Sequence, residues 1–204
     1  MKWLVWPVVL VLAVATFGQQ FGLAGTKWHY VLINDGSART LWPGGTEQQA
    51  TLATQFLKEV VQPRSDLGTL VSFNDKATID VENSTNPDEL AAKLIRHGRG
   101  GTAVYDSIVA AADWLDKEDS TGRQKMIFVF SDFDDDASYT SLGNTISLVQ
   151  RAHIPVIFIV PSVVERKTQG KNVKQLAKDT GGHAYFVDKD GSFDFAAMKH
   201  DLGR

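Results

Sequence analysis

The sequence has 204 residues, of which 43% are hydrophobic and 22% are charged, and its formal net charge is -3. This length suits one medium-sized domain with its own core, and the charge indicates neither a nucleic-acid-binding surface nor an acidic tail. The chain contains no cysteine, which excludes disulfides, thiolate metal sites and cysteine nucleophiles.

The N-terminus predicts an export segment. Residues 3–17 are uncharged and mostly apolar, but this run of about 15 residues is shorter than the roughly 20 that a membrane-spanning helix needs. Residues 13–15, Ala-Val-Ala, provide the small side chains of a cleavage site. We therefore expect residues 1–26 to be a signal peptide, or an uncleaved membrane anchor, with a short linker. Residues 27–204 would then form a secreted or periplasmic domain, which contacts a membrane only if residues 3–17 are retained.

Apolar strands and amphipathic helices alternate along the rest of the chain. The predicted strands are residues 27–33, 67–73, 77–81, 125–130, 155–160 and 184–187. The predicted helices are residues 46–61, 87–95, 104–115, 142–152, 173–179 and 193–200. This alternation predicts an α/β fold with a Rossmann-like, mostly parallel central sheet, one antiparallel edge strand and helices on both faces.

The second predicted helix has the clearest start. Asn86 can cap it, Pro87 suits the first helical position, and Glu89 can reach back as in a capping box. We expect this helix to run through Ile95 and to stop at Gly98.

Polar side chains gather where the carboxyl ends of the strands should meet. Asp35 and Ser37 follow the first strand, Asp132 follows the strand of residues 125–130, and Thr102 opens a helix behind two glycines. Ligands of open α/β sheets bind in the crevice at this edge. Carboxylate and hydroxyl oxygens suit Mg²⁺ or Mn²⁺ with some waters retained. The four residues therefore form a candidate metal site.

These motifs, in this order, resemble the von Willebrand factor type A domains of secreted bacterial proteins. That family carries D-x-S-x-S after its first strand, a threonine before its third helix and an aspartate after its fourth strand. Together these residues form the metal-ion-dependent adhesion site. The chain has Asp35-x-Ser37-x-Arg39, then Thr102, then Asp132. Further similar stretches are TLVSFND at 69–75, HIPVIFI at 153–159 and DTGGHAYF at 179–186, so the likeness covers residues 27–186.

The resemblance implies a non-catalytic domain that recognises a protein partner. An acidic side chain or other anionic group of the partner would complete the coordination of a cation held by Asp35, Ser37, Thr102 and Asp132. Arg39 departs from the family pattern, because it stands at the position of the second serine and a guanidinium cannot ligate a cation.

Arg39 leaves two alternatives open. In the first, it turns to solvent, and water or the hydroxyl of Thr40 fills the coordination gap. In the second, it forms ion pairs with Asp35 and Asp132 and replaces the cation, which gives a metal-free module that binds an anionic partner group through Arg39. We place Arg39, Thr40 and Arg99, which precedes Thr102 at the rim of the crevice, in the partner-binding set.

A metal-dependent phosphohydrolase is the rival hypothesis, since a divalent cation at such an edge can serve hydrolysis. Against it, the sequence shows no positioned nucleophile or base, no G-x-S-x-G and no lysine of a phosphate loop. The run Asp134-Asp135-Asp136 lacks the glycine and glutamate of a calcium loop. We expect it to be a solvated acidic loop that adds negative field to the site.

Overall fold

The structure is a computed structural model that describes residues 25–95 and 98–204. The predicted export segment therefore lies outside the described residues, apart from its last two positions. Across the part of the chain that the structure describes, every helix is too short or too polar to span a bilayer.

Six strands form one sheet in the order β3-β2-β1-β4-β5-β6. Their bounds are β1 (Trp28–Asp35), β2 (Leu67–Phe73), β3 (Ala77–Ser84), β4 (Gln124–Phe130), β5 (Val156–Pro161) and β6 (His183–Val187). All neighbouring strands run parallel except β2 and β3, which are antiparallel. The predicted α/β class, with a mostly parallel sheet and one antiparallel edge strand, is confirmed.

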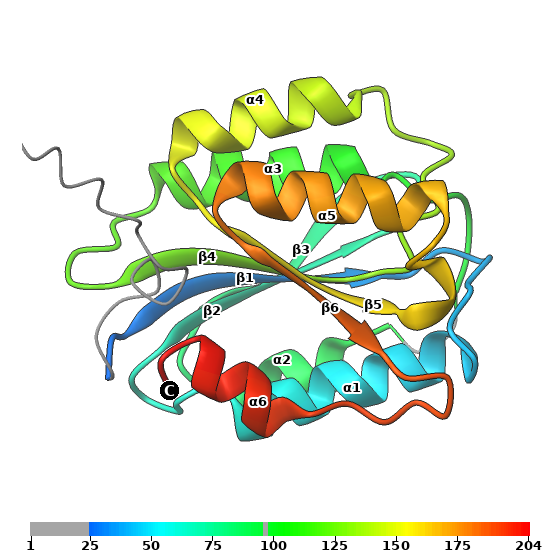
Figure 1. Ribbon diagram of the computed structural model, residues 1–204. Coiled ribbons are helices and arrows are strands. Elements are labelled where there is room, and N and C mark those ends of the chain that lie inside the picture. Colours follow the sequence, from blue (N-terminus) through cyan, green and yellow to red (C-terminus); the bar gives the residue numbers. More distant parts are fainter. Residues whose placement is uncertain (1–24, 96–97) are drawn as a thin grey trace, which may run out of the picture.

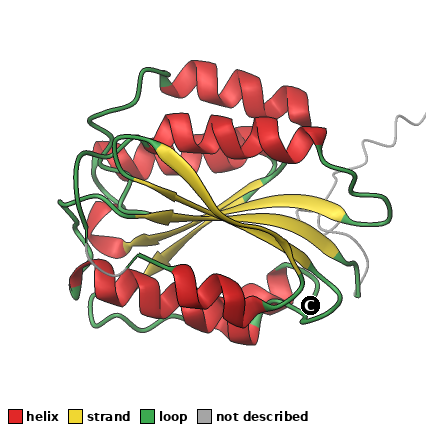
Figure 2. Cartoon of the chain, turned by 180° about the vertical axis from the view of Figure 1, so that it is seen from behind, coloured by secondary structure: helices red, strands yellow, loops and turns green. Residues whose placement is uncertain are grey.

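Helices cover both faces of the sheet, which gives the domain three layers (Figures 1 and 2). One face carries α3 (Val104–Lys117), α4 (Leu142–Ala152) and α5 (Thr168–Thr180), and the other carries α1 (Gly45–Glu59), α2 (Pro87–Lys93) and α6 (Phe195–Asp201). Along β1, Tyr30 and Leu32 enter the core on the α1 side, and Val31 and Ile33 enter the core on the α3 side. Burial on both faces explains why the central strands are continuous apolar runs.

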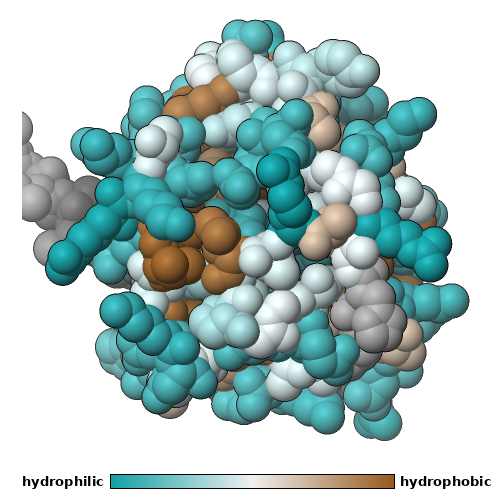
Figure 3. Space-filling view, turned by 90° about the vertical axis from the view of Figure 1, so that its right-hand side faces the viewer, coloured by the Kyte–Doolittle hydropathy of each residue, from teal (hydrophilic) through white to brown (hydrophobic). Residues whose placement is uncertain are grey.

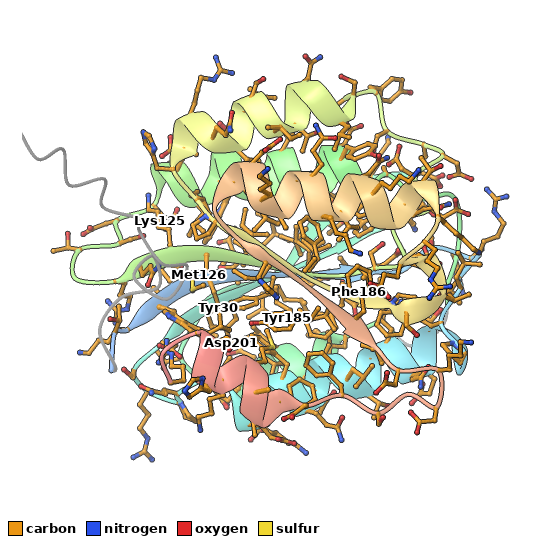
Figure 4. The ribbon with its side chains drawn as sticks, in the orientation of Figure 1. Tyr30, Lys125, Met126, Tyr185, Phe186 and Asp201 are labelled. Carbon is orange, nitrogen blue, oxygen red and sulfur yellow. The ribbon has the colours of Figure 1, made fainter. Side chains whose placement is uncertain are left out.

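The α6 face of the sheet is rich in aromatic side chains. Tyr30 of β1 and Met126 of β4 lie on this face, and Tyr185 of β6 lies beside Asp201 of α6 (Figure 4). The hydroxyl of Tyr185 is 3.4 Å from Oδ2 of Asp201. The ring of Tyr30 meets that of Phe128 edge-on, with 6.1 Å between the ring centroids. The contact between Tyr185 and Asp201 links α6 to the edge strand β6, and the contact between Tyr30 and Phe128 packs β1 against β4 beneath it.

The predicted capping box of α2 is wrong. Asn86 does cap the helix, because its side chain accepts a hydrogen bond from the N–H of Asp88 at 3.1 Å. Glu89, however, accepts a hydrogen bond from the hydroxyl of Ser84 at 2.6 Å. The N–H of Asn86 donates to that same hydroxyl oxygen at 3.0 Å, so a serine at the end of β3 takes the place of the glutamate.

Several element bounds also differ from the prediction by two or more residues, and three of them have a clear physical reason. Helix α2 ends at Lys93 rather than at Ile95, because Leu94 takes an extended ψ of 131°. Helix α5 begins at Thr168, ahead of the apolar positions that predicted it, since its first turn is polar. Strand β3 continues to Ser84, because its polar end still pairs with β2 across an irregular register.

The strand order reverses between β1 and β4. The chain leaves β1 for β2 on one side, whereas β4 leads to β5 on the other side. Open α/β sheets bind ligands outside the carboxyl ends of the strands at such a switch point. The ends of β1 and β4, at Asp35 and Phe130, are therefore the expected position of a ligand-binding site.

Candidate functional site

Asp35 and Asp132 come together because of the register of β1 and β4. Asn34 lies opposite Phe130 in this parallel pair, so the next residues, Asp35 and Ser131, are neighbours. The hydroxyl of Ser131 donates a hydrogen bond to Oδ2 of Asp35 at 2.6 Å. Asp132 follows directly after Ser131, which places the two predicted charged ligands beside each other.

Both carboxylates are buried in a way that disfavours their charge. Asp35 is 3% exposed and Asp132 is 1% exposed. Burial raises the pKa of Asp35 to about 6, although hydrogen bonds from Ser131 and Ser37 oppose the shift, and the charge of Asp132 adds to it. Burial also raises the pKa of Asp132. Among residues 25–95 and 98–204, no lysine or arginine forms an ion pair with either carboxylate, so the charge of the pair is not balanced there.

Hydroxyl groups of the β1–α1 loop lie next to these carboxylates. The N–H of Ser37 donates to Oδ1 of Asp35 at 2.9 Å, and the hydroxyl of Ser37 donates to the carbonyl oxygen of Arg39 at 3.0 Å. Thr40 lies beside Asp132: the N–H of the next residue, Leu41, donates to Oδ2 of Asp132, and the side chain of Thr40 opposes the rise in the pKa of that carboxyl. A hydroxyl therefore lies at the site one residue beyond the position of the missing serine.

Thr102 is held in place by its main chain. Its N–H donates to Oδ1 of Asp136 at 2.7 Å, and its carbonyl oxygen accepts hydrogen bonds from the N–H groups of Asp136 and Ala137. The residue is 2% exposed. Its hydroxyl takes part in no hydrogen bond within the described part of the chain, so this oxygen remains available as a ligand.

Arg39 turns away from the two buried carboxylates. Its guanidinium forms an ion pair with Asp136, and the two side chains are 72% and 36% exposed. Of the two alternatives drawn from the sequence, the outward orientation agrees with the structure. The ion pairs with Asp35 and Asp132 that the second alternative requires are absent from the described contacts, because Asp136 offers a carboxylate that costs less desolvation.

The acidic run after Asp132 is more than the solvated loop that we expected. Asp134 accepts a hydrogen bond from the side chain of Gln169 at 2.7 Å, and Asp135 accepts one from the N–H of Val104 at 2.9 Å. Asp136 accepts a hydrogen bond from the N–H of Thr102 at 2.7 Å. This hydrogen bond lowers the pKa of the Asp136 carboxyl, and the nearby Arg39 lowers it further. The three carboxylates therefore fix the loops around the site. Sequence reasoning missed this role, because their partners lie about 30 residues away in the chain.

Phe133 fixes the turn that follows Asp132. It is 2% exposed and has a φ of 61°, which is rare for a bulky residue. Its ring meets those of Tyr105 and Phe158 edge-on, at centroid distances of 5.3 and 5.4 Å. Packing on both sides of the ring thus holds the turn in a backbone conformation with positive φ. The sequence does not predict this conformation for a phenylalanine.

Gly98 and Gly36 let the loops approach closely. A Cβ on Gly98 would lie 1.8 Å from the carbonyl oxygen of Ser37, and one on Gly36 would lie 2.6 Å from Cδ1 of Ile95. Only glycine fits at position 98, because the clash there is with main chain, whereas a side chain at position 36 would require the end of the Ile95 side chain to move. The loop that carries Arg99 and Thr102 therefore packs directly on the loop that carries Ser37.

The oxygen set fits a hard divalent cation. Asp35 and Asp132 supply charge, and Ser37, Thr40 and Thr102 supply neutral oxygens. Each carboxylate oxygen keeps a lone pair beyond the hydrogen bonds it accepts. No cluster of three or more histidine, aspartate or glutamate side chains suited to a metal occurs in the described residues. A cation here would depend on hydroxyls and water, a set that Mg²⁺ tolerates well.

The chain resembles known proteins in its structure, not in its overall sequence. No protein-family model matches the sequence, and a search of curated proteins returns no match. An aerotolerance-related membrane protein from Bacteroides fragilis aligns with 86% of this chain and 98% of its own, with a TM-score of 0.60 and 14% identity. A von Willebrand factor type A protein from Catenulispora acidiphila aligns with 87% of this chain and 41% of its own, with a TM-score of 0.57 and 15% identity.

A third similar structure carries a metal at the corresponding kind of site. Proximal thread matrix protein 1 from the mussel byssus aligns with 87% of this chain and 46% of its own, with a TM-score of 0.62 and 15% identity. That protein is described with zinc in its metal-ion-dependent adhesion site. These likenesses, together with the strand order and the parallel sheet, show that the chain has the fold of the von Willebrand factor type A domains.

Proposed function

We propose that this chain is a non-catalytic binding domain that uses a divalent cation to hold an acidic group of a protein partner. The observation that carries the proposal is the pair of buried carboxylates, Asp35 and Asp132, whose charge no described side chain balances. A bound cation would balance this charge, lower both pKa values and offer a positive centre to a carboxylate of the partner.

The ligands that we assign are Asp35, Ser37, Thr102 and Asp132, and Thr40 stands in for the missing second serine. Mg²⁺ or Mn²⁺ suits this set of oxygens best. The zinc that the mussel byssus protein carries supports a divalent cation at this edge. For this reason Zn²⁺ should be tested beside Mg²⁺ and Mn²⁺.

The surface around the site supports a protein partner. Viewed onto the carboxyl edge, the molecule is mainly hydrophilic, with a compact hydrophobic patch left of the centre and smaller hydrophobic areas elsewhere (Figure 3). At this edge, Val163 in the short helix after β5 is 42% exposed, and Leu41 next to Thr40 is half-buried. Apolar side chains rimmed by polar ones are typical of sites that bind proteins. Domains of this fold generally act as binding modules, which supports a role without catalysis.

We further propose that the domain acts outside the cytoplasm, either secreted, periplasmic or held at a membrane by residues 3–17. The apolar N-terminal run supports this location. The protein of the same fold from Bacteroides fragilis is described as a membrane protein, which is consistent with a place at the cell envelope.

Cation binding can be tested by thermal unfolding of the full chain with Mg²⁺, Mn²⁺ and Zn²⁺. A cation at tenfold excess over its dissociation constant should stabilise the native chain by about 1.4 kcal/mol, which raises Tm by about 3 °C. Asp132→Asn should abolish the response. Asp134→Asn, which changes a carboxylate of the same loop that contacts Gln169, should keep it.

Arg39→Ser decides between the two forms of the proposal. It restores the hydroxyl of the family pattern and removes a repelling charge, so the cation should bind roughly fivefold more tightly. If a cation raised the Tm of Arg39→Ser but not that of the native chain, the native chain would be a metal-free binding module. No response to any cation in either protein would show that the cation-assisted function is wrong.

A further inference from the structure

Two arginines on the rim of the site come from loops that are bonded to each other. The N–H of Arg99 donates to the carbonyl oxygen of Gly36 at 2.8 Å, and the N–H of Ala38 donates to that of Gly100 at 3.1 Å. These bonds place the segment around Arg99 alongside the segment that leads from Ser37 to Arg39. Arg39 and Arg99 therefore both belong to the pair of hydrogen-bonded loop segments that also carries Ser37.

Both arginines keep most of their hydrogen-bonding capacity. A guanidinium has five N–H donors, and Arg39 uses Nη2 to contact Asp136. Its side chain is 72% exposed, and it forms no other hydrogen bond or ion pair within residues 25–95 and 98–204. Arg99 is exposed, and its guanidinium has no hydrogen bond or ion pair in the same part of the structure. The rim thus offers unsatisfied donors beside the cation site.

Three acidic residues nearby each give at least one carboxylate oxygen to a main-chain N–H of the protein itself. Asp136 accepts a hydrogen bond from the N–H of Thr102, and Asp75 accepts one from the N–H of Gly101 at 2.8 Å. Asp135 accepts from the N–H of Val104. These carboxylates close the loops through main-chain contacts, whereas the guanidinium groups have donors left for a ligand. The donors that Arg39 and Arg99 have left favour an anion at this rim.

We propose that the partner segment carries two acidic side chains, one for the cation and a second for Arg39 and Arg99. This inference rests on the proposed cation-assisted function. A planar guanidinium binds a carboxylate through two parallel hydrogen bonds, so it selects this group in a way that a point charge does not. A partner with one acidic group would leave the two arginines solvated. The ligand class is an acidic peptide with neighbouring carboxylates.

Two blocked peptides that differ by one carboxylate test the proposal, acetyl-Gly-Glu-Gln-amide and acetyl-Gly-Glu-Glu-amide. Their affinity for the full chain can be measured by NMR titration in Mg²⁺. The second peptide should bind roughly fivefold more tightly. The advantage should vanish in the double variant Arg39→Gln with Arg99→Gln, in which glutamine removes the charge without supplying the hydroxyl ligand that serine would.

Arg166→Gln is the matched control, because it removes an exposed arginine from the same edge of the sheet. Equal affinity of the native chain for both peptides, with binding still lost in Asp132→Asn, would overturn this inference and leave the proposed function standing. If Arg166→Gln also lost the preference for the peptide with two glutamates, that preference would depend on net charge alone, and this inference would be overturned too. Binding of neither peptide, or a preference that needs no cation, would overturn the inference together with the proposed function.

Discussion

Burial of Asp35 should make the cation-free domain less stable at neutral pH than at mildly acidic pH. The pKa of this carboxyl is about 6 in the folded chain and near 3.9 in an unfolded one. The folded state therefore binds more protons between these values, and the free energy of unfolding falls as the pH rises from about 4 to about 6. Asp35→Asn should remove the share of this dependence that comes from Asp35 and leave the share from Asp132, whose pKa burial also raises. Near pH 7 it should raise the free energy of unfolding by up to about 3 kcal/mol.

Urea unfolding in EDTA at several pH values, for the native chain and for Asp35→Asn, measures this effect. The same variant should lose the Tm response to Mg²⁺, because it removes a charged ligand. Gain of stability with loss of binding at one residue is the pattern expected of a functional site. If Asp35→Asn were less stable than the native chain near pH 7 in EDTA, the carboxylate would be a structural acceptor for Ser37 and Ser131 instead.

At the scale of the loop, Gly98 should be needed for the site more than for the fold. An alanine Cβ there would lie 1.8 Å from the carbonyl oxygen of Ser37, so Gly98→Ala must push the two loops apart. We expect the cation response to disappear while the circular dichroism of the sheet and helices persists, at a cost of about 1 to 3 kcal/mol in stability.

Gly143→Ala is the control for this substitution. Gly143 lies in α4, and a Cβ there meets nothing within 4 Å. Alanine at that position should therefore add up to about 1 kcal/mol through its higher helix propensity and leave cation binding unchanged. An unaltered response in Gly98→Ala would show that the contact between the Arg99 loop and Ser37 does not shape the site.

The strands and helices could be predicted from sequence because their periodicity reflects burial that is local in the chain. The apolar run ending at Phe130 and the Asn86-Pro87 start are examples. The roles of Asp136 and Phe133 could not be predicted, since a carboxylate that caps Thr102 and a ring that fixes a turn depend on contacts between distant segments. The orientation of Arg39 was open for the same reason.

At the scale of the whole molecule, the site forms where the chain order of the sheet reverses, so it depends on β1 and β4 lying side by side. The other end of β1 is held by a buried ion pair. Nη2 of Arg204 lies 3.0 Å from Oδ1 of Asp66, with the two side chains 1% and 0% exposed. The guanidinium of Arg204 also stacks on the ring of Trp28 at 3.5 Å, so the segment after α6 is fastened to the first residue of β1.

Arg204→Met should therefore destabilise the whole domain. It leaves the charge of Asp66 buried with only the N–H groups of Trp28 and Gln62 as donors, and loss of one partner of a buried pair costs about 3 kcal/mol. Adding Asp66→Asn should recover part of this loss, since no charge is then left unpaired. Lys199→Met, at an exposed position of α6, should change the free energy of urea unfolding by less than about 0.5 kcal/mol. A loss as small as that in Arg204→Met would mean that neither the ion pair nor the stacked guanidinium contributes much to the stability of the domain.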